Sequence, residues 1–267
     1  MVLTIAGSDS GGGSGLQADL RSFAARSVHG VCSLTVISSQ NTKEFRSALP
    51  VPALVVRSQI EAILDDFDVK SVKTGLLYSE ENIELIGEMA DADLLPSLIV
   101  DPVIVNRHGE LLYDSATMGL MRQRLIPRAL VITPNHIEAM HILGAEIEDD
   151  VDSLAKAALE LAAMGPSVVA LTGGRRNAPS MVDVVACNGQ VTFLEGERFL
   201  TNNVRGTGDT FSAVIAAEVA KGTSLLDSVQ KAQTFTAEAV RRAATWKLGS
   251  GSGPIDHLGQ LNEARLD

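Results

Sequence analysis

Short runs of β-branched residues alternate with longer stretches of helical periodicity along the whole chain. Because parallel strands need long crossovers, usually helices, this alternation predicts a mostly parallel central sheet with helices on both faces. No Pro-rich linker or break in composition divides the sequence, so we expect one α/β domain over residues 1–267. Strands are predicted at Val2–Ala6, Val31–Ser38, Val69–Thr74, Leu98–Asp101, Ala129–Thr133, Val168–Thr172, Val182–Cys187 and Val191–Leu194. Helices are predicted at Leu16–Ala25, Pro52–Asp65, Glu80–Met89, Ser115–Arg124, Asn135–Leu143, Asp152–Met164, Thr210–Lys221 and Leu225–Thr245.

The net charge and the scarcity of aromatic residues restrict the partners that the surface can bind. The chain carries a formal charge of −11, and only 4% of its residues are aromatic. Binders of nucleic acids or anionic membranes usually present positive charge, so we expect neither partner. The two cysteines lack the spacing of a metal site or a disulfide framework, which favours a reducing cytoplasm. No apolar stretch reaches the ~20 residues of a membrane span.

A glycine-rich segment, residues 7–15, follows the first predicted strand and leads into the first predicted helix. In an open parallel sheet, ligands bind beyond the carboxyl ends of the strands, which is where this segment lies. Residues 13–18 fit a dinucleotide-binding fingerprint, but the acid that would hold the ribose is missing after the next strand. The alternative is a flexible turn capped by Ser14, with Gln17 closing a capping box.

A second glycine-bearing loop, residues 205–210 with the sequence Arg-Gly-Thr-Gly-Asp-Thr, directly precedes a predicted helix. Gly206 and Gly208 flank Thr207, so consecutive backbone N–H groups can point to one spot at a helix N-terminus, where the dipole favours negative charge. This pattern predicts an anion hole for charge that develops on a transferred phosphoryl group. Asp209 at its rim can accept a proton from an attacking hydroxyl, or alternatively only caps the helix.

Acidic residues after two further strands are candidates for a metal site. Asp101 follows an apolar strand, and Glu138 stands three residues after Asn135. Mg²⁺ keeps several waters and uses few carboxylates beside phosphates, so these acids suit it. Each has a structural alternative: Asp101-Pro102 can simply end a strand, and Asn135 with Glu138 can form a capping box.

Taken in order, these motifs resemble the ribokinase-like superfamily, and within it the hydroxymethylpyrimidine/phosphomethylpyrimidine kinases of thiamine biosynthesis. The likeness spans nearly the whole chain. It is carried by Ala6–Gly12, Gln17–Leu20, Ser39–Thr42, Val100–Val103, Thr133–Asn135, Arg205–Thr210 and Gly251–His257. The resemblance implies a three-layer ribokinase-like fold and a homodimer. It also implies phosphorylation, dependent on ATP and Mg²⁺, of 4-amino-5-hydroxymethyl-2-methylpyrimidine, its monophosphate, or both.

The resemblance also implies roles for individual residues. A pyrimidine pocket would be lined by Gly7, Asp19, Gln40, Leu76 and Val103, with Arg107 and Arg205 offering positive charge to a substrate phosphate. The nucleotide would be bound by Asn135, Thr172, Gly173, Gly174 and Thr207, and Mg²⁺ by Asp101 and Glu138. Gly206, Thr207, Gly208 and Asp209 would form the anion hole and catalytic position. The Gln40 amide can accept from an exocyclic amino group and donate to the adjacent ring nitrogen.

The sequence departs from the family pattern at several of these positions. Asp209 stands where the family usually has cysteine, Thr172 replaces a lysine, and Leu76 replaces a methionine. A phosphomonoester is already largely ionised and needs cations more than a base, so Arg205 and Arg107 favour the monophosphate as a substrate. A pyridoxal or pyridoxine kinase is the nearest alternative. The lost lysine leaves a catalytically weak metabolite-binding regulator as another.

Overall fold

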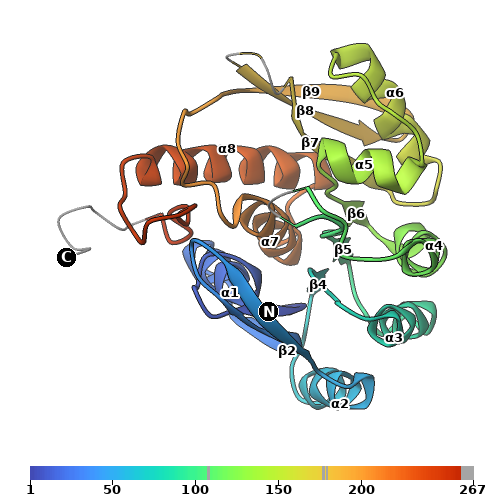
Figure 1. Ribbon diagram of the computed structural model, residues 1–267. Helices are drawn as coiled ribbons and strands as arrows, with labels where there is room; N and C mark the ends of the chain where they lie inside the picture. The colour runs from blue at the N-terminus through green and yellow to red at the C-terminus, as the bar shows by residue number, and fades with distance from the viewer. Residues whose placement is uncertain (107–108, 176–177, 179, 260–267) are drawn as a thin grey trace.

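The computed structural model describes residues 1–106, 109–175, 178 and 180–259 (Figure 1). The strands are β1 (Val2–Asp9), β2 (Gly30–Gln40), β3 (Phe45–Pro50), β4 (Ser71–Thr74), β5 (Leu98–Val100), β6 (Val131–Ile132), β7 (Val168–Gly174), β8 (Ser180–Cys187) and β9 (Gln190–Glu197). The α-helices are α1 (Gly15–Ala25), α2 (Ala53–Leu64), α3 (Glu80–Asp91), α4 (Ser115–Arg124), α5 (His136–Leu143), α6 (Val151–Ala162), α7 (Thr207–Ala220) and α8 (Leu225–Ala243), and a 3-10 helix, η1, spans Ile126–Arg128.

The strands form one sheet with a parallel middle. Within the described residues nine strands lie in the order β3-β2-β1-β4-β5-β6-β7-β8-β9. Neighbours from β2 to β7 pair in parallel, whereas β3, β8 and β9 pair antiparallel at the two edges. The predicted α/β architecture with a mostly parallel sheet is confirmed.

Two features differ from the elements expected from the sequence. Strand β3 was not expected; it lies at an edge, and five of its six residues are exposed, so no buried apolar face marks it in the sequence. Helix α7 begins at Thr207 rather than Thr210, because Gly206 adopts a left-handed backbone (φ +83°) that starts the helix one turn earlier. The loop predicted to form the anion hole is therefore the first turn of α7.

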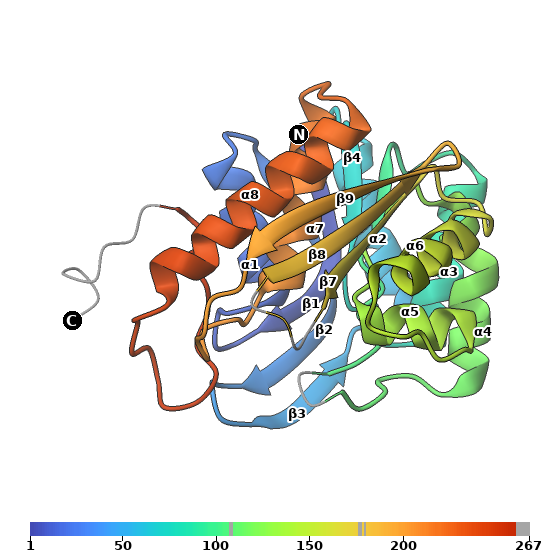
Figure 2. The ribbon, with the colours of Figure 1, turned by 90° about the horizontal axis from the view of Figure 1, so that it is seen from above.

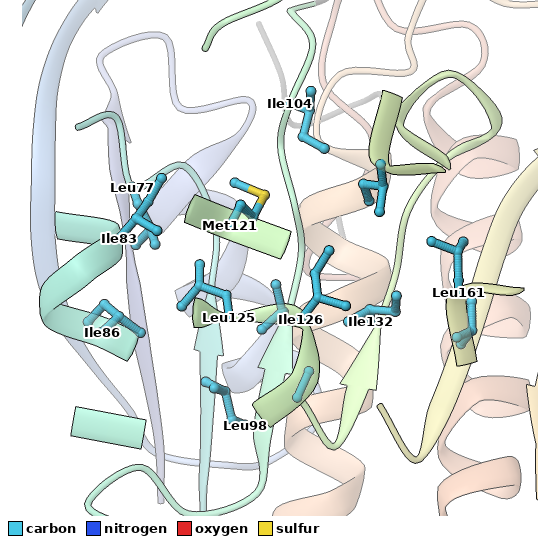
Figure 3. Close-up of a cluster of buried hydrophobic side chains, with 14 of the residues drawn as sticks. Leu77, Ile83, Ile86, Leu98, Ile104, Met121, Leu125, Ile126, Ile132 and Leu161 are labelled. Carbon is cyan, nitrogen blue, oxygen red and sulfur yellow. The ribbon is translucent and has the colours of Figure 1, made fainter. Parts of the chain in front are cut away.

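Helices cover both faces of the sheet, which makes three layers. Helices α1, α7 and α8 lie on one face, and α2 to α6 lie on the other (Figures 1 and 2). Alternate strand residues serve the two layers: Val2 packs with the α7 and α8 side chains, whereas the next residue, Leu3, packs with the layer of α2 to α6. Figure 3 shows part of the second layer, where Ile86 and Met121 of the helices face Leu98 and Ile132 of the sheet.

Helix α7 is the most deeply embedded of these helices. Nine of its residues, Thr210 to Glu218, are buried in succession. Near its C-terminal end Glu218 accepts hydrogen bonds from Arg26, Lys221 and Lys231. Burial alone would raise the pKa of Glu218, but these three cations lower it to about 2.

No helix in the described part of the chain combines the length and apolar character that crossing a bilayer requires.

Candidate active site

Asp9, at the end of β1, organises the glycine-rich loop. Its carboxylate is buried and accepts from the N–H groups of Gly11 (2.8 Å) and Gly13 (3.1 Å) and from the Ser14 hydroxyl (2.9 Å). The Ser14 side chain makes no cap bond to α1, and Gln17 instead accepts from the Asp9 N–H. The capping box at Ser14, which was the alternative for this segment, does not form, because the Ser14 hydroxyl donates to Asp9 instead.

Arg205 joins this loop to the start of α7. Its Nε and Nη2 both lie 2.9 Å from Asp9 Oδ2, and its side chain is 12% exposed. The predicted contact of Arg205 with a substrate phosphate is therefore in competition with a buried ion pair to Asp9. The other predicted cation, Arg107, lies outside the described residues.

The first turn of α7 presents backbone donors. The Thr207 N–H and hydroxyl both donate to the Val204 carbonyl. Within the described residues no acceptor contacts the N–H of Gly208 or of Asp209. These two groups lie at the positive end of a 14-residue helix, which is a favourable place for an anion.

Gly206 lies in direct contact with the glycine-rich loop and with the C-terminal segment. A Cβ on Gly206 would lie 2.2 Å from the Gly13 carbonyl oxygen and 2.5 Å from His257 Cε1. His257 in turn places its Nδ1 2.8 Å from the Thr210 hydroxyl. Burial lowers the pKa of His257 to about 4, so its ring is neutral at pH 7. Only glycine fits at this junction.

A buried lysine that the sequence analysis missed lies beneath α7. Lys73, on β4, is fully buried, and its Nζ lies 2.7 Å from Asp19 Oδ1. The same Nζ lies 3.9 Å from Asp101 Oδ2 and 3.8 Å from Asp209 Oδ1. Burial raises the pKa of Asp19 and of Asp101 to about 7 each, although the Lys73 charge opposes the shift. The Lys73 ammonium thus lies within 4 Å of three carboxyl groups, those of Asp19, Asp101 and Asp209, which come from three separate parts of the chain.

The position of Asp19 does not agree with its predicted role in the pyrimidine pocket. The side chain is fully buried, and its second oxygen accepts from the Thr4 hydroxyl at 2.6 Å. Both oxygens are therefore hydrogen-bonded to other side chains of the protein interior.

The two acids predicted to serve Mg²⁺ differ in their surroundings. Asp101 Oδ2 accepts from the Ser212 hydroxyl at 2.9 Å. Glu138 Oε1 accepts from the Ile104 N–H at 2.9 Å, and Oε2 from the Asn135 N–H at 3.0 Å, so the alternative of a capping box at Asn135 is confirmed. Among the described residues, no cluster of three or more His, Cys, Asp or Glu side chains is arranged to hold a metal ion. An ion here would take most of its ligands from water and phosphate, as Mg²⁺ does at nucleotide sites.

The predicted nucleotide residues lie after β6 and in the last residues of β7. Asn135 forms a parallel bridge with Thr172, which places the two side by side. The Gly173 N–H donates to Asp183 Oδ1 at 2.9 Å, so Asp183 of β8 holds this loop. A Cβ on Gly174 would lie 2.5 Å from a leucine of α6. Gly174 therefore serves packing, whereas the other three lie together at the carboxyl edge.

The predicted pyrimidine residues lie near the ends of β1 and β2 or directly after β4 and β5. A Cβ on Gly7 would lie 2.6 Å from Val36 Cγ1 and 3.7 Å from Leu76 Cδ2, so β1, β2 and β4 meet closely here. The Gln40 side-chain amide has no hydrogen-bond partner among the described residues. Val103 has φ +43°, a conformation that is rare for a β-branched residue and costs ~1–3 kcal/mol. Gly7 and Leu76 are thus brought together, whereas Gln40 lies beside the glycine-rich loop, where the Ser10 hydroxyl donates to its backbone carbonyl.

Comparison with known proteins assigns the chain to a family. A family model described as phosphomethylpyrimidine kinase matches residues 9–256. The chain belongs to the phosphomethylpyrimidine kinase family. A relative from Streptomyces coelicolor named hydroxymethylpyrimidine/phosphomethylpyrimidine kinase is 37% identical over 263 residues, which cover 98% of this chain and 96% of the relative. As a member of this kinase family, the protein is a phosphotransferase.

Solved structures of related kinases share the fold. An ADP complex of Bacillus subtilis pyridoxal kinase matches with a TM-score of 0.89 and 34% identity, over 100% of this chain and 98% of that chain. Phosphomethylpyrimidine kinase from Clostridium difficile matches with a TM-score of 0.79 and 32% identity, over 90% and 98% of the two chains. The predicted ribokinase-like fold is confirmed.

Sequence reasoning missed three buried charged residues of this phosphomethylpyrimidine kinase family member: Asp9, Lys73 and Asp183. Lys73 had a usable signal, since it is a charged residue within a predicted strand, Val69–Thr74, of a parallel sheet that is expected to be covered on both faces. A buried lysine requires a carboxylate partner, so the sequence could have prompted a search for one. Asp183 had a similar signal, since it is the lone charge in the predicted strand Val182–Cys187. Asp9 had none, because it follows the first predicted strand and meets its partners, the N–H groups of the glycine-rich loop and Arg205, only in the folded chain.

Proposed function

We propose that this kinase uses ATP to phosphorylate 4-amino-5-hydroxymethyl-2-methylpyrimidine, its monophosphate, or both, in thiamine biosynthesis. The observation that carries the proposal is the Asp209 carboxylate in the first turn of α7, beside two unpaired backbone N–H groups, in a chain of this family. The residues assigned to the pyrimidine lie near the ends of β1 and β2 or directly after β4 and β5, and those assigned to ATP lie after β6 and in the last residues of β7. Helix α7 packs on β1, β4 and β5, and Asp209 in its first turn lies 3.8 Å from Lys73 of β4, so this turn adjoins the group assigned to the pyrimidine.

With the alcohol as substrate, Asp209 acts as the base. The hydroxyl oxygen attacks the γ-phosphorus, the hydroxyl proton passes to Asp209, and ADP leaves. The N–H groups of Gly208 and Asp209, together with the dipole of α7, stabilise the charge on the phosphoryl oxygens. Gly206 and Thr207 shape the turn that presents these donors.

With the monophosphate as substrate, a cation matters more than a base. Arg205 is engaged by Asp9, which neutralises its charge in place. Arg107 then remains as the residue proposed to meet the substrate phosphate. The two phosphorylations therefore depend on different side chains, Asp209 for the alcohol and Arg107 for the monophosphate.

On the nucleotide side, Asn135, Thr172 and Gly173 are proposed to contact ATP, with Thr207 at the boundary between the two substrates. Gly174 supports this loop from below. Mg²⁺, which neutralises phosphate charge when bound, would be held by Asp101 together with water and phosphate oxygens. Glu138 contributes indirectly, because it fixes the backbone at Ile104 and Asn135.

The pyrimidine ring is proposed to lie between Gly7, Leu76 and Val103, with the Gln40 amide on its polar edge. A free amide beside small and aliphatic residues suits a flat ring that carries an amino group.

The resemblance of the chain to homodimeric kinases, and the apolar side chains exposed at the β2–β3 edge (Ile37, Phe45 and Leu49), support a homodimer of one-domain subunits. Light scattering tests this state.

A substrate panel tests the activity. ADP release is measured with Mg·ATP and, separately, hydroxymethylpyrimidine, its monophosphate and pyridoxal. Turnover of either pyrimidine supports the proposal. Turnover of pyridoxal alone identifies the second candidate, a pyridoxal kinase, which the TM-score of 0.89 to the Bacillus subtilis enzyme favours. No turnover of any of the three would point to a metabolite-binding regulator.

Replacing the proposed base tests the role of Asp209. Asp209→Asn should lower kcat for the alcohol about 10²–10⁴-fold, because a general base is lost, with little change in the KM for ATP. Asp227→Asn is the matched control, since Asp227 is also the third residue of its helix, α8. Equal kcat values for the two variants would remove Asp209 from the mechanism.

A further inference from the structure

Lys73 has no part in the mechanism described so far, yet it is the residue on which three acidic side chains converge. Its side chain is 0% exposed, and its ammonium is hydrogen-bonded to Asp19 of α1. Asp101, after β5, and Asp209, in α7, lie within 4 Å of the same Nζ. Asp101 is the acid proposed to hold Mg²⁺, and Asp209 is the acid proposed to act as the base.

The ammonium remains charged in this setting. Burial alone would lower the pKa of Lys73, but the carboxylates of Asp19, Asp209 and Asp101 raise it above its usual value. One ammonium therefore faces three carboxyl groups, and burial favours the protonated form of two of them, Asp19 and Asp101. A structural ion pair needs only Asp19, so stability gives no reason for the other two acids to gather here.

The acid of the cluster with the most exposed side chain is Asp209. Its side chain is 19% exposed, whereas that of Asp101 is 8% exposed and tied to the Ser212 hydroxyl. The negative charges of Asp209 and Asp101 repel each other: burial raises the pKa of Asp101, and the charge of Asp209 raises it further. Without a cation between them, the Asp209 carboxylate would turn away from Asp101 and toward solvent.

We propose that Lys73 is a positioning residue for phosphoryl transfer: its ammonium, anchored on Asp19, holds the Asp209 carboxylate at the first turn of α7 against the repulsion of Asp101. The inference rests on the proposed function, in which Asp209 faces the reacting hydroxyl. Lys73 itself touches neither substrate, since it is fully buried.

The test removes both charges of the close pair. Lys73→Met alone would leave the buried Asp19 carboxylate without its cation and endanger the fold, so the variant is Lys73→Met with Asp19→Asn. The new amide oxygen can still accept from the Thr4 hydroxyl. We expect this paired variant to fold, with kcat reduced about 100-fold, as for a reacting group displaced by ~1 Å, and with both KM values little changed. Wild-type kcat in the folded variant would overturn the proposal.

Two further measurements separate positioning from a general loss of stability. Glu218→Gln removes a buried carboxylate at the other end of α7, and it should lower stability without lowering kcat. In an Asp209→Asn background, the paired variant should cause little additional loss, because no carboxylate remains to be positioned. An equal loss of kcat in both backgrounds would contradict an action through Asp209.

A crystal structure of the paired variant gives a readout that is independent of the substrate. The Asp209 carboxylate should leave its place near residue 73 and turn to solvent. If it stays in place, Lys73 does not position it. If the wild-type protein phosphorylates none of the panel, the proposed function fails, and the crystal structure alone then decides the role of Lys73.

Discussion

The contact between Gly206 and the glycine-rich loop predicts how much stability the protein loses when Gly206 is replaced by alanine, which adds one methyl group. Gly206 and Gly222 both have φ +83°, and they flank the two ends of the same helix, α7. Around Gly222 a Cβ would meet no atom within 4 Å, whereas at Gly206 it would lie 2.2 Å from the Gly13 carbonyl oxygen. The alanine variants at these two positions therefore share the backbone strain and differ in the clash.

The magnitudes follow from these two terms. A left-handed alanine costs ~1–2 kcal/mol, which is the whole effect expected for Gly222→Ala. Gly206→Ala adds an overpacking cost of ~1–3 kcal/mol, because the backbone of the glycine-rich loop must move. The difference of ~1–3 kcal/mol corresponds to a further fall in Tm of roughly 2–12 °C for a chain of this size.

Urea unfolding followed by circular dichroism measures the two stabilities, and the kinase assay measures the consequence for the site. A shifted first turn also moves the N–H groups of the anion hole, so Gly206→Ala should lower kcat by about 10²–10³, whereas Gly222→Ala should leave it unchanged. Equal loss of stability in the two variants would refute the close contact.

Two further predictions concern buried carboxylates. Asp9→Ala should lower the free energy of unfolding by ~3–5 kcal/mol, because it leaves Arg205 without its buried partner. The control is Glu44→Ala, which removes an exposed ion pair with Arg46. In urea unfolding, the control should change the free energy of unfolding little. Burial raises the pKa of Asp183 from 3.8 to about 6, so the folded state binds the Asp183 proton more tightly than the unfolded chain does. Asp183 therefore makes the stability of the protein fall as the pH rises from about 4 to about 6. Asp183→Asn should remove that part of the fall in thermal melts at pH 4, 5, 6 and 7, and parallel curves for variant and wild type would contradict the assignment.

The periodicity of the sequence was sufficient to predict most of the fold. Buried strands such as Val168–Gly174 are continuous apolar runs, and the helices show clear apolar faces, so their positions follow from local pattern. Strand β3 has no such pattern, because an exposed edge strand is specified by its pairing with β2. That pairing is a property of the assembled sheet.

The candidate site was predictable only in part, for a similar reason. The glycines around Thr207 mark the start of α7 in the sequence, and the structure places them there. The partners of charged side chains are set in three dimensions: Arg205 meets Asp9 across 196 positions of sequence, and Lys73 meets Asp19 across 54. A pattern over a few residues cannot reveal which charges neutralise each other.

Helix α7 is fixed at both ends, and this limits how the enzyme can respond to its substrates. Gly206 abuts the Gly13 carbonyl at one end, three cations hold Glu218 at the other, and the residues between are buried. A helix held in this way neither slides nor rotates without breaking the core. Any closure around bound ligands must therefore come from loops that move toward α7. The anion hole then acts as the stationary reference point against which the two substrates are aligned.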